Sequence, residues 1–131
     1  MILLDTCVLV FDALAPERLS AKALQAIEEG EEQSALACCD ISLWEIAMLV
    51  AKGRLDPGTE VLPFLNLVLT SRAVRTLPIT PEIAQISAMD DLFVHHDPAD
   101  RIIAATALYH EKPLLTCDEA LRAVKGLKII W

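Results

Sequence analysis

The chain has 131 residues, 54% of them apolar, and a formal net charge of −8 at pH 7. This length suits one domain with a core of its own, so we expect residues 1–131 to form a single domain. The chain lacks a run of about eighteen apolar residues, which argues against a membrane-spanning helix, and its acidity argues against a broad basic face for nucleic acid.

The four cysteines do not follow the spacing of a zinc site. Cys38 and Cys39 are adjacent, and no C-x-x-C pair occurs with Cys7 or Cys117. All four fall in or beside apolar segments, where a free thiol packs as a small apolar side chain. We therefore expect reduced thiols, as in a cytoplasmic protein.

The first half of the chain alternates between short apolar runs and helical patterns. Apolar runs predict strands over 2–4 and 34–38. Turn and capping residues place three helices between and after them: from Thr6 to just before Pro16, from Ser20 through Glu29 with Gly30 closing it, and over 41–53 with Asp40 or Ser42 as its cap.

The second half continues the same alternation. Helices are expected from Pro57 to about Arg72 with Pro63 as a break, from Pro81 to about Met89, over 98–111, and briefly after Asp118. Strands are expected over 74–79, 113–116 and 127–131, the first of these at a sheet edge because it contains Pro78. The pattern predicts an α/β fold with three layers, in which helices flank a mainly parallel central sheet of about five strands.

The stretch Asp97-Pro98-Ala99-Asp100-Arg101 starts an otherwise apolar helix. Asp97 suits the N-cap and Pro98 the first helical position. Asp100 shares a helical face with Ile103 and Ala104, which we expect to be buried, and a buried carboxylate needs a partner. Its alternative role is the third helical residue of a capping box that Asp97 begins.

Two other aspartates directly follow predicted strands. Asp5 follows the strand over 2–4, and Asp118 comes shortly after the strand over 113–116. Each, taken alone, is well explained as a helix N-cap. Both also lie at the carboxyl ends of strands expected to be parallel, and this is the edge where open α/β sheets bind ligands.

Glu45 is the most unusual of the acidic residues because its helix has almost no polar face. Ser42 lies one turn earlier and can extend a narrow polar stripe. A buried carboxylate must be protonated, pair with a cation or bind a metal. If Asp5, Glu45, Asp100 and Asp118 converge, their oxygen ligands favour Mg²⁺ or Mn²⁺ over zinc.

Four motifs in this order resemble the PIN-domain ribonucleases, and among them the VapC-type toxins of toxin–antitoxin pairs. The motifs are D-T at 5–6, S-x-x-E at 42–45, D-P-x-D-R-x-I-A-A-x-A at 97–107, and L-x-T-x-D at 114–118. The resemblance implies a PIN fold and an endoribonuclease that depends on Mg²⁺ or Mn²⁺. It also implies a homodimer, a small antitoxin partner and RNA as the substrate.

By the same resemblance, the catalytic and metal-binding residues are Asp5, Glu45, Asp100 and Asp118. Asp97 would cap or support the site, and Thr6 and Thr116 match positions that help to hold a metal-bound water. One departure concerns the groove wall, since Glu119 follows the last aspartate where many relatives carry an aromatic residue.

The remaining candidates have competing explanations. His95, His96 and Arg101 can contact the phosphate chain; a solvated turn explains the histidines equally well, and a salt bridge to Asp97 or another acid explains Arg101. Four apolar residues are candidates for a dimer or antitoxin surface, although each also suits the core: Phe11, Leu14, Phe64 and Leu65.

Two other functions are compatible with the sequence. The first is a PIN-like binding or regulatory module that is catalytically silent or held inactive by a partner. The second is an acidic pocket of the phosphatase or response-regulator type. That pocket needs a lysine at a strand end, whereas Lys112 precedes its strand.

Overall fold

The computed structural model describes residues 1–93 and 97–131, so His95 and His96 lie outside the described residues. The strands are β1 (Ile2–Leu4), β2 (Leu36–Cys39), β3 (Arg75–Leu77), β4 (Leu114–Leu115) and β5 (Ile129–Ile130). The helices are α1 (Thr6–Leu14), the 3₁₀ turn η1 (Pro16–Arg18), α2 (Ala21–Glu32), α3 (Ile41–Ala51), α4 (Val61–Thr70), α5 (Pro81–Ser87), α6 (Pro98–His110) and α7 (Glu119–Arg122).

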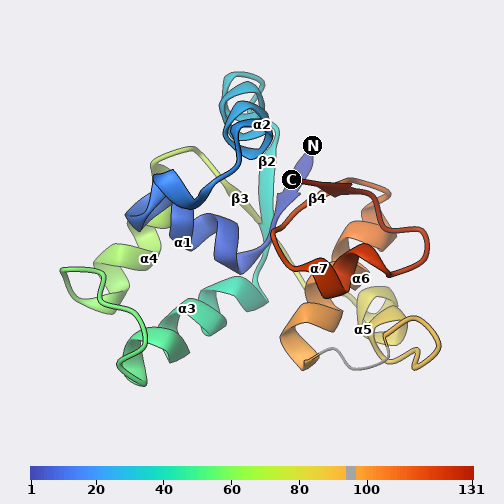
Figure 1. Cartoon of the computed structure of the whole chain (residues 1–131). Coiled ribbons are helices and arrows are strands. Elements are labelled where there is room, and N and C mark those ends of the chain that lie inside the picture. Colours follow the sequence, from blue (N-terminus) through green and yellow to red (C-terminus); the bar gives the residue numbers. More distant parts are fainter. Residues whose placement is uncertain (94–96) are drawn as a thin grey trace.

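The five strands form one sheet in the order β3-β2-β1-β4-β5, and every neighbouring pair is parallel. The predicted α/β fold with a parallel sheet of about five strands is therefore confirmed, and β3 lies at an edge as expected. Because all strands run in one direction, their carboxyl ends meet at a single edge of the sheet. The first and last thirds of the chain meet at the centre, where β1 pairs with β4 (Figure 1).

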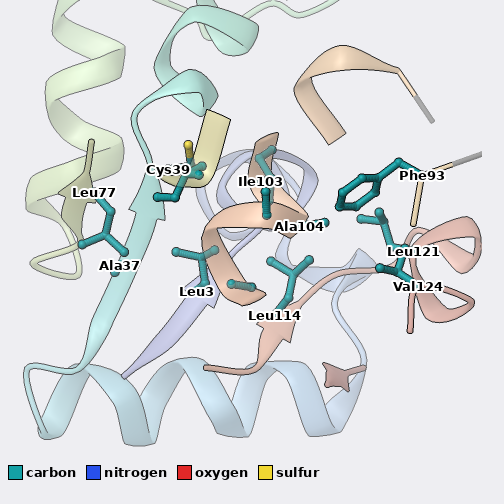
Figure 2. Packing of buried hydrophobic residues seen from close by; sticks show 13 residues of the cluster. Leu3, Ala37, Cys39, Leu77, Phe93, Ile103, Ala104, Leu114, Leu121 and Val124 are labelled. Atoms are coloured by element: carbon teal, nitrogen blue, oxygen red, sulfur yellow. The ribbon is translucent and has the colours of Figure 1, made fainter. Parts of the chain in front are cut away.

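Helices cover both faces of the sheet, which gives the three layers (Figure 1). Adjacent strand residues point to opposite faces. Leu4 and Leu115 pack with α1, α2, α3 and α4 on one face. Leu3 and Leu114 pack under α6 on the other face, together with Phe93 and residues of α5 and α7 (Figure 2). The core is thus two apolar clusters separated by the sheet.

Two predicted helix boundaries were wrong. Gly30 does not close α2, which continues to Glu32. A Cβ atom at residue 30 would stand 2.3 Å from Leu36 Cδ2, so this glycine allows α2 to pack closely on β2. Pro57 does not start a helix either, because the Asp56 carboxylate accepts a hydrogen bond from the Gly58 N–H at 2.9 Å and forms a turn there.

The end of α3 was predicted correctly at Gly53, and its geometry matters for the site. Gly53 has φ +69°, a left-handed conformation that closes the helix. Its N–H donates to Val50 O at 3.1 Å, and the Arg54 N–H donates to Leu49 O at 2.9 Å. This pair of bonds turns the chain sharply and brings Arg54 back beside Leu49.

None of the described helices is long and apolar enough to cross a membrane.

Candidate functional site

Asp5 and Asp118 lie together at the carboxyl edge of the sheet because β1 and β4 are neighbours. Asp5 Oδ1 accepts from the Thr6 N–H at 2.8 Å at the start of α1. Asp118 Oδ1 accepts from the Ala120 N–H at 2.9 Å at the start of α7. Both predicted capping roles are confirmed. A cap uses one carboxylate oxygen, so capping leaves each aspartate an oxygen for other contacts.

Thr116 connects the two aspartates. Its hydroxyl donates to Asp5 Oδ2 at 2.5 Å, across 111 residues of sequence, and accepts from the Asp118 N–H at 3.0 Å. Thr116 and Asp5 are both buried, so neither side chain can move freely. The hydroxyl therefore fixes the orientation of the Asp5 carboxylate.

Glu45 reaches the same place from α3 through Thr6. Thr6 Oγ1 lies 2.5 Å from Glu45 Oε1 and 2.9 Å from Ser42 Oγ. A hydroxyl has one hydrogen and an ionised carboxylate only accepts, so Thr6 donates to Glu45 and receives the Ser42 hydrogen. This confirms the polar stripe expected along an apolar helix.

Asp97 and Asp100 come from the start of α6. Asp97 is the N-cap, and its Oδ1 accepts from the Asp100 N–H at 2.8 Å. Asp97 is exposed, whereas Asp100 is half-buried, one helical turn before the core residue Ile103. The cap thus fixes the first turn from which the Asp100 side chain extends.

All four predicted carboxylates line one cleft of 380 Å³. Its other lining residues are Thr6, Cys7, Val10, Phe11, Arg18, Leu49, Arg54, Leu55 and Cys117. Segments from β1, α3, α6 and the end of β4 therefore converge on a single concave surface.

Burial and mutual repulsion raise the pKa of these acids. Burial, followed by repulsion from Asp97, Asp5 and Asp118, raises the pKa of Asp100 to about 8. Burial raises the pKa of Asp5 even though Thr116 donates to it, and burial also raises the pKa of Glu45. The negative charge in this cleft is therefore poorly compensated by the protein.

Within the described residues, no lysine or arginine forms an ion pair with the four carboxylates of the cleft. The ion pairs found there join Arg72 to Asp12 and Glu31, and Arg101 to Asp90. None of them involves the four carboxylates of the cleft. A cation from outside the chain would relieve the repulsion between them.

The donor chemistry fits a hard divalent cation. The cleft offers carboxylate and hydroxyl oxygens, the ligands that Mg²⁺ and Mn²⁺ prefer. Within 1–93 and 97–131, no three His, Cys, Asp or Glu side chains already stand close enough together to hold a metal. Mg²⁺ does not require such a cage, since it keeps several waters and commonly takes one or two carboxylates.

Arg101 does not contact Asp97, one of its expected partners. Its Nε donates to Ser87 O at 2.7 Å and an Nη donates to Asp90 at 3.0 Å, so it joins α6 to the end of α5. This is the salt bridge with another acid that the sequence allowed. The other candidate for phosphate contact, His96, lies outside the described residues.

Sequence reasoning missed several residues of the cleft. Cys7 and Cys117 are not core residues like Cys38 and Cys39; they are half-buried on the cleft wall, with sulfurs 3.3 Å apart. All four thiols are free, as expected. In the sequence, this location is indicated only by the closeness of Cys7 to Asp5 and of Cys117 to Asp118.

Arg18 and Arg54 also line the cleft without having been predicted there. Arg18 lies in η1, with its guanidinium carbon 4.1 Å from the ring centre of Phe11. Arg54 is placed by the turn at Gly53. A surface arginine after a helix carries no sequence signal of such a location.

Comparisons with known proteins agree with this geometry. The model of the PIN domain family matches residues 2–127. The chain is 38% identical over 122 residues to the protein named Ribonuclease VapC22 from Mycobacterium tuberculosis (strain ATCC 25618 / H37Rv). The aligned residues cover 93% of this chain and 90% of that protein.

Two solved structures share the fold. VapBC2 from Rickettsia felis, bound to a DNA fragment from its promoter, has a TM-score of 0.75 at 16% identity, covering 98% of this chain and 97% of that chain. FitAcB from Neisseria gonorrhoeae has a TM-score of 0.65 at 23% identity, covering 98% and 96%. At these identities the two structures support the fold alone.

Proposed function

Because this chain belongs to the PIN domain family, we propose that it is a Mg²⁺- or Mn²⁺-dependent endoribonuclease that hydrolyses RNA phosphodiester bonds in the cytoplasm. We further propose that it is the toxin of a type II toxin–antitoxin pair. The 38% identity to a protein named as a VapC ribonuclease supports the choice of RNA. The observation that carries the proposal is the cleft in which four carboxylates converge and none of them forms an ion pair with a lysine or arginine of the described residues.

In the proposed site, Asp5 and Asp100 would hold the ion together with Asp118 and Glu45. When bound, the ion lowers the pKa of a water and neutralises negative charge on the scissile phosphate. Thr116 holds Asp5 in place through its hydrogen bond, and Asp97 fixes the turn that presents Asp100.

Glu45 is suited to accept the proton of the attacking water. Burial raises the pKa of this carboxyl, and a general base works best when its pKa approaches the ambient pH. The Thr6 hydroxyl holds one carboxylate oxygen at 2.5 Å, which leaves the other oxygen for water. Thr6 is thus proposed to orient the base rather than to bind RNA.

An apolar surface supports a protein partner. On α4, Leu62 is 65% exposed and Leu67 is 54% exposed, and Leu14 at the end of α1 is also exposed. Phe64 is only 1% exposed and belongs to the core, which is one of the two roles that the sequence allowed for it. We propose that a small antitoxin covers the exposed leucines and that the toxin is a homodimer.

The test is an RNA-cleavage assay with purified protein, in Mg²⁺ or Mn²⁺ and in EDTA, comparing the wild type with Asp100→Asn. We expect cleavage by the wild type with either metal, none in EDTA, and at least an approximately 100-fold loss in the variant. Equal activity of the two proteins would reject the site. No cleavage by the folded wild type would favour the alternative, a silent binding module.

A further inference from the structure

A second cleft of 420 Å³ adjoins the acidic one. The two clefts share Glu45, Leu49 and Arg54 in their walls, so they form one continuous surface. The remaining wall of the second cleft consists of Trp44, Met48, Lys52, Asp97, Pro98 and Ala99. Its volume is that of a site for a small organic group.

Trp44 is the aromatic side chain of this second cleft. Trp44 directly precedes Glu45 on α3. Its side chain is 57% exposed, whereas Glu45 is half-buried. The side chain is therefore not part of the core. A flat indole on an open groove next to a phosphodiester site is a platform on which a nucleobase can stack.

Two cations flank this platform without a protein partner. Arg72 and Arg101 are held by acidic side chains, but in the part of the chain that the structure describes, Lys52 and Arg54 make no ion pair and no side-chain hydrogen bond. Both are exposed, and the turn at Gly53 places them at this end of α3. In a chain with a net charge of −8, such free cations mark a place where an anion is tolerated.

The distribution of charge in this cleft also determines how a bound RNA strand would be oriented. Glu45 on α3 and Asp97 at the start of α6 repel phosphate, whereas Lys52 and Arg54 attract it at the carboxyl end of α3. A neutral base therefore fits the interior of the cleft, and phosphates fit the end near the two cations.

We propose that this second cleft binds the nucleotide that flanks the scissile phosphate, with Trp44 stacked on its base and Lys52 and Arg54 on the adjoining phosphates. The inference rests on the proposed ribonuclease function and adds to it a base-binding subsite at Trp44, which requires an unpaired base. A paired base has both faces covered by its neighbours in the helix, so it cannot stack on Trp44.

The test uses the fluorescence of Trp44. The chain has two tryptophans, so Trp131→Phe leaves Trp44 as the sole tryptophan. A short single-stranded RNA oligonucleotide is titrated into this variant in EDTA, where no cleavage interferes. We expect saturable quenching, and much weaker quenching by the same sequence as a duplex.

Affinity is measured in parallel on otherwise unchanged protein. Trp44→Ala should weaken binding of the single strand about tenfold, as expected for the loss of one stacked base. Tyr109→Ala, which removes another exposed aromatic side chain from α6, is the matched control and should bind like the wild type. Replacing both Lys52 and Arg54 by Gln should reduce the magnitude of the slope of log affinity against log salt by about 1.4.

The outcomes separate this inference from the proposed function. Absence of quenching, or wild-type affinity of Trp44→Ala, overturns the subsite even if the wild type cleaves RNA. A change in the elution volume of Trp44→Ala with unchanged RNA affinity overturns it in favour of a protein interface. Quenching by RNA without any metal-dependent cleavage supports the RNA contact and rejects the nuclease.

Discussion

Carboxylates gather at two places in this molecule, and the two groups differ in whether they form ion pairs. Around Arg72, the guanidinium donates twice to Asp12 and once to Glu31, all at 2.9 Å, so this arginine joins α1 and α2 to the chain after α4. In the acidic cleft, no lysine or arginine of the described residues pairs with Asp5 or Asp100.

This difference separates charges that stabilise the fold from charges that we propose bind a metal ion. The hydrogen bonds that Arg72 donates to Asp12 raise the pKa of Arg72, which means that the folded state favours the charged pair. In the cleft, burial and repulsion raise the pKa of Asp100 to about 8, which means that the folded state disfavours the anion. Four predictions test this comparison.

The largest expected effect is that of Asp100→Asn, which should act on activity and stability in opposite directions. The amide removes a repelled charge, so the variant should melt at a higher temperature than the wild type in EDTA, although its cleavage falls at least about 100-fold. Thermal unfolding with and without Mg²⁺ measures this. A lower melting temperature in EDTA would show that the carboxylate is structural.

Arg72→Met should have the reverse effects: it should lower stability and leave RNA cleavage unchanged. It leaves the half-buried Asp12 without its partner, so we expect a loss of about 1–2 kcal/mol in the free energy of unfolding with unchanged cleavage. Urea denaturation measures the loss. Arg75→Met is the control, because Arg75 forms no ion pair within 1–93 and 97–131 and should change stability little. A strong loss of cleavage at full stability would contradict the structural role.

Gly53→Ala tests how the free cations are placed. At φ +69° an alanine is strained, so we expect a loss of about 1 kcal/mol of stability. Because the turn positions Arg54, RNA binding in EDTA should weaken as well. Gly58→Ala, also at a positive φ but outside both clefts, should lose similar stability and bind RNA normally.

The last prediction is a dependence of stability on pH. Carboxyls whose pKa is raised on folding stabilise the protein fully below their unfolded value. This contribution is lost as the pH rises through the folded value, here from 3.8 to about 8 for Asp100. In EDTA, the melting temperature should therefore fall over this range, and saturating Mg²⁺ or the Asp100→Asn change should reduce the fall. The same fall of the melting temperature with pH in all three samples would show that other groups cause it.

The sequence predicted the sheet and much of the site because short-range rules determine them. Asp5 and Asp118 cap helices that follow strands, and the parallel order of those strands brings the two caps together. The failures depend on tertiary contacts. Gly30 resembles a helix end but serves the close approach of Leu36, and Cys7 resembles a core residue but meets Cys117 in the cleft. Such contacts join residues distant in sequence, so no local pattern reveals them.

The hydrogen bond from Thr116 to Asp5 has a consequence for biosynthesis. It joins residues that are 111 positions apart, and β4, which leads to Thr116, must pair with β1 before the bond can form. A ribosome that has released only the first half of the polypeptide therefore carries Asp5 and Glu45 but no assembled centre. Long-range closure of this kind would delay the proposed RNA cleavage until translation of the domain is almost finished.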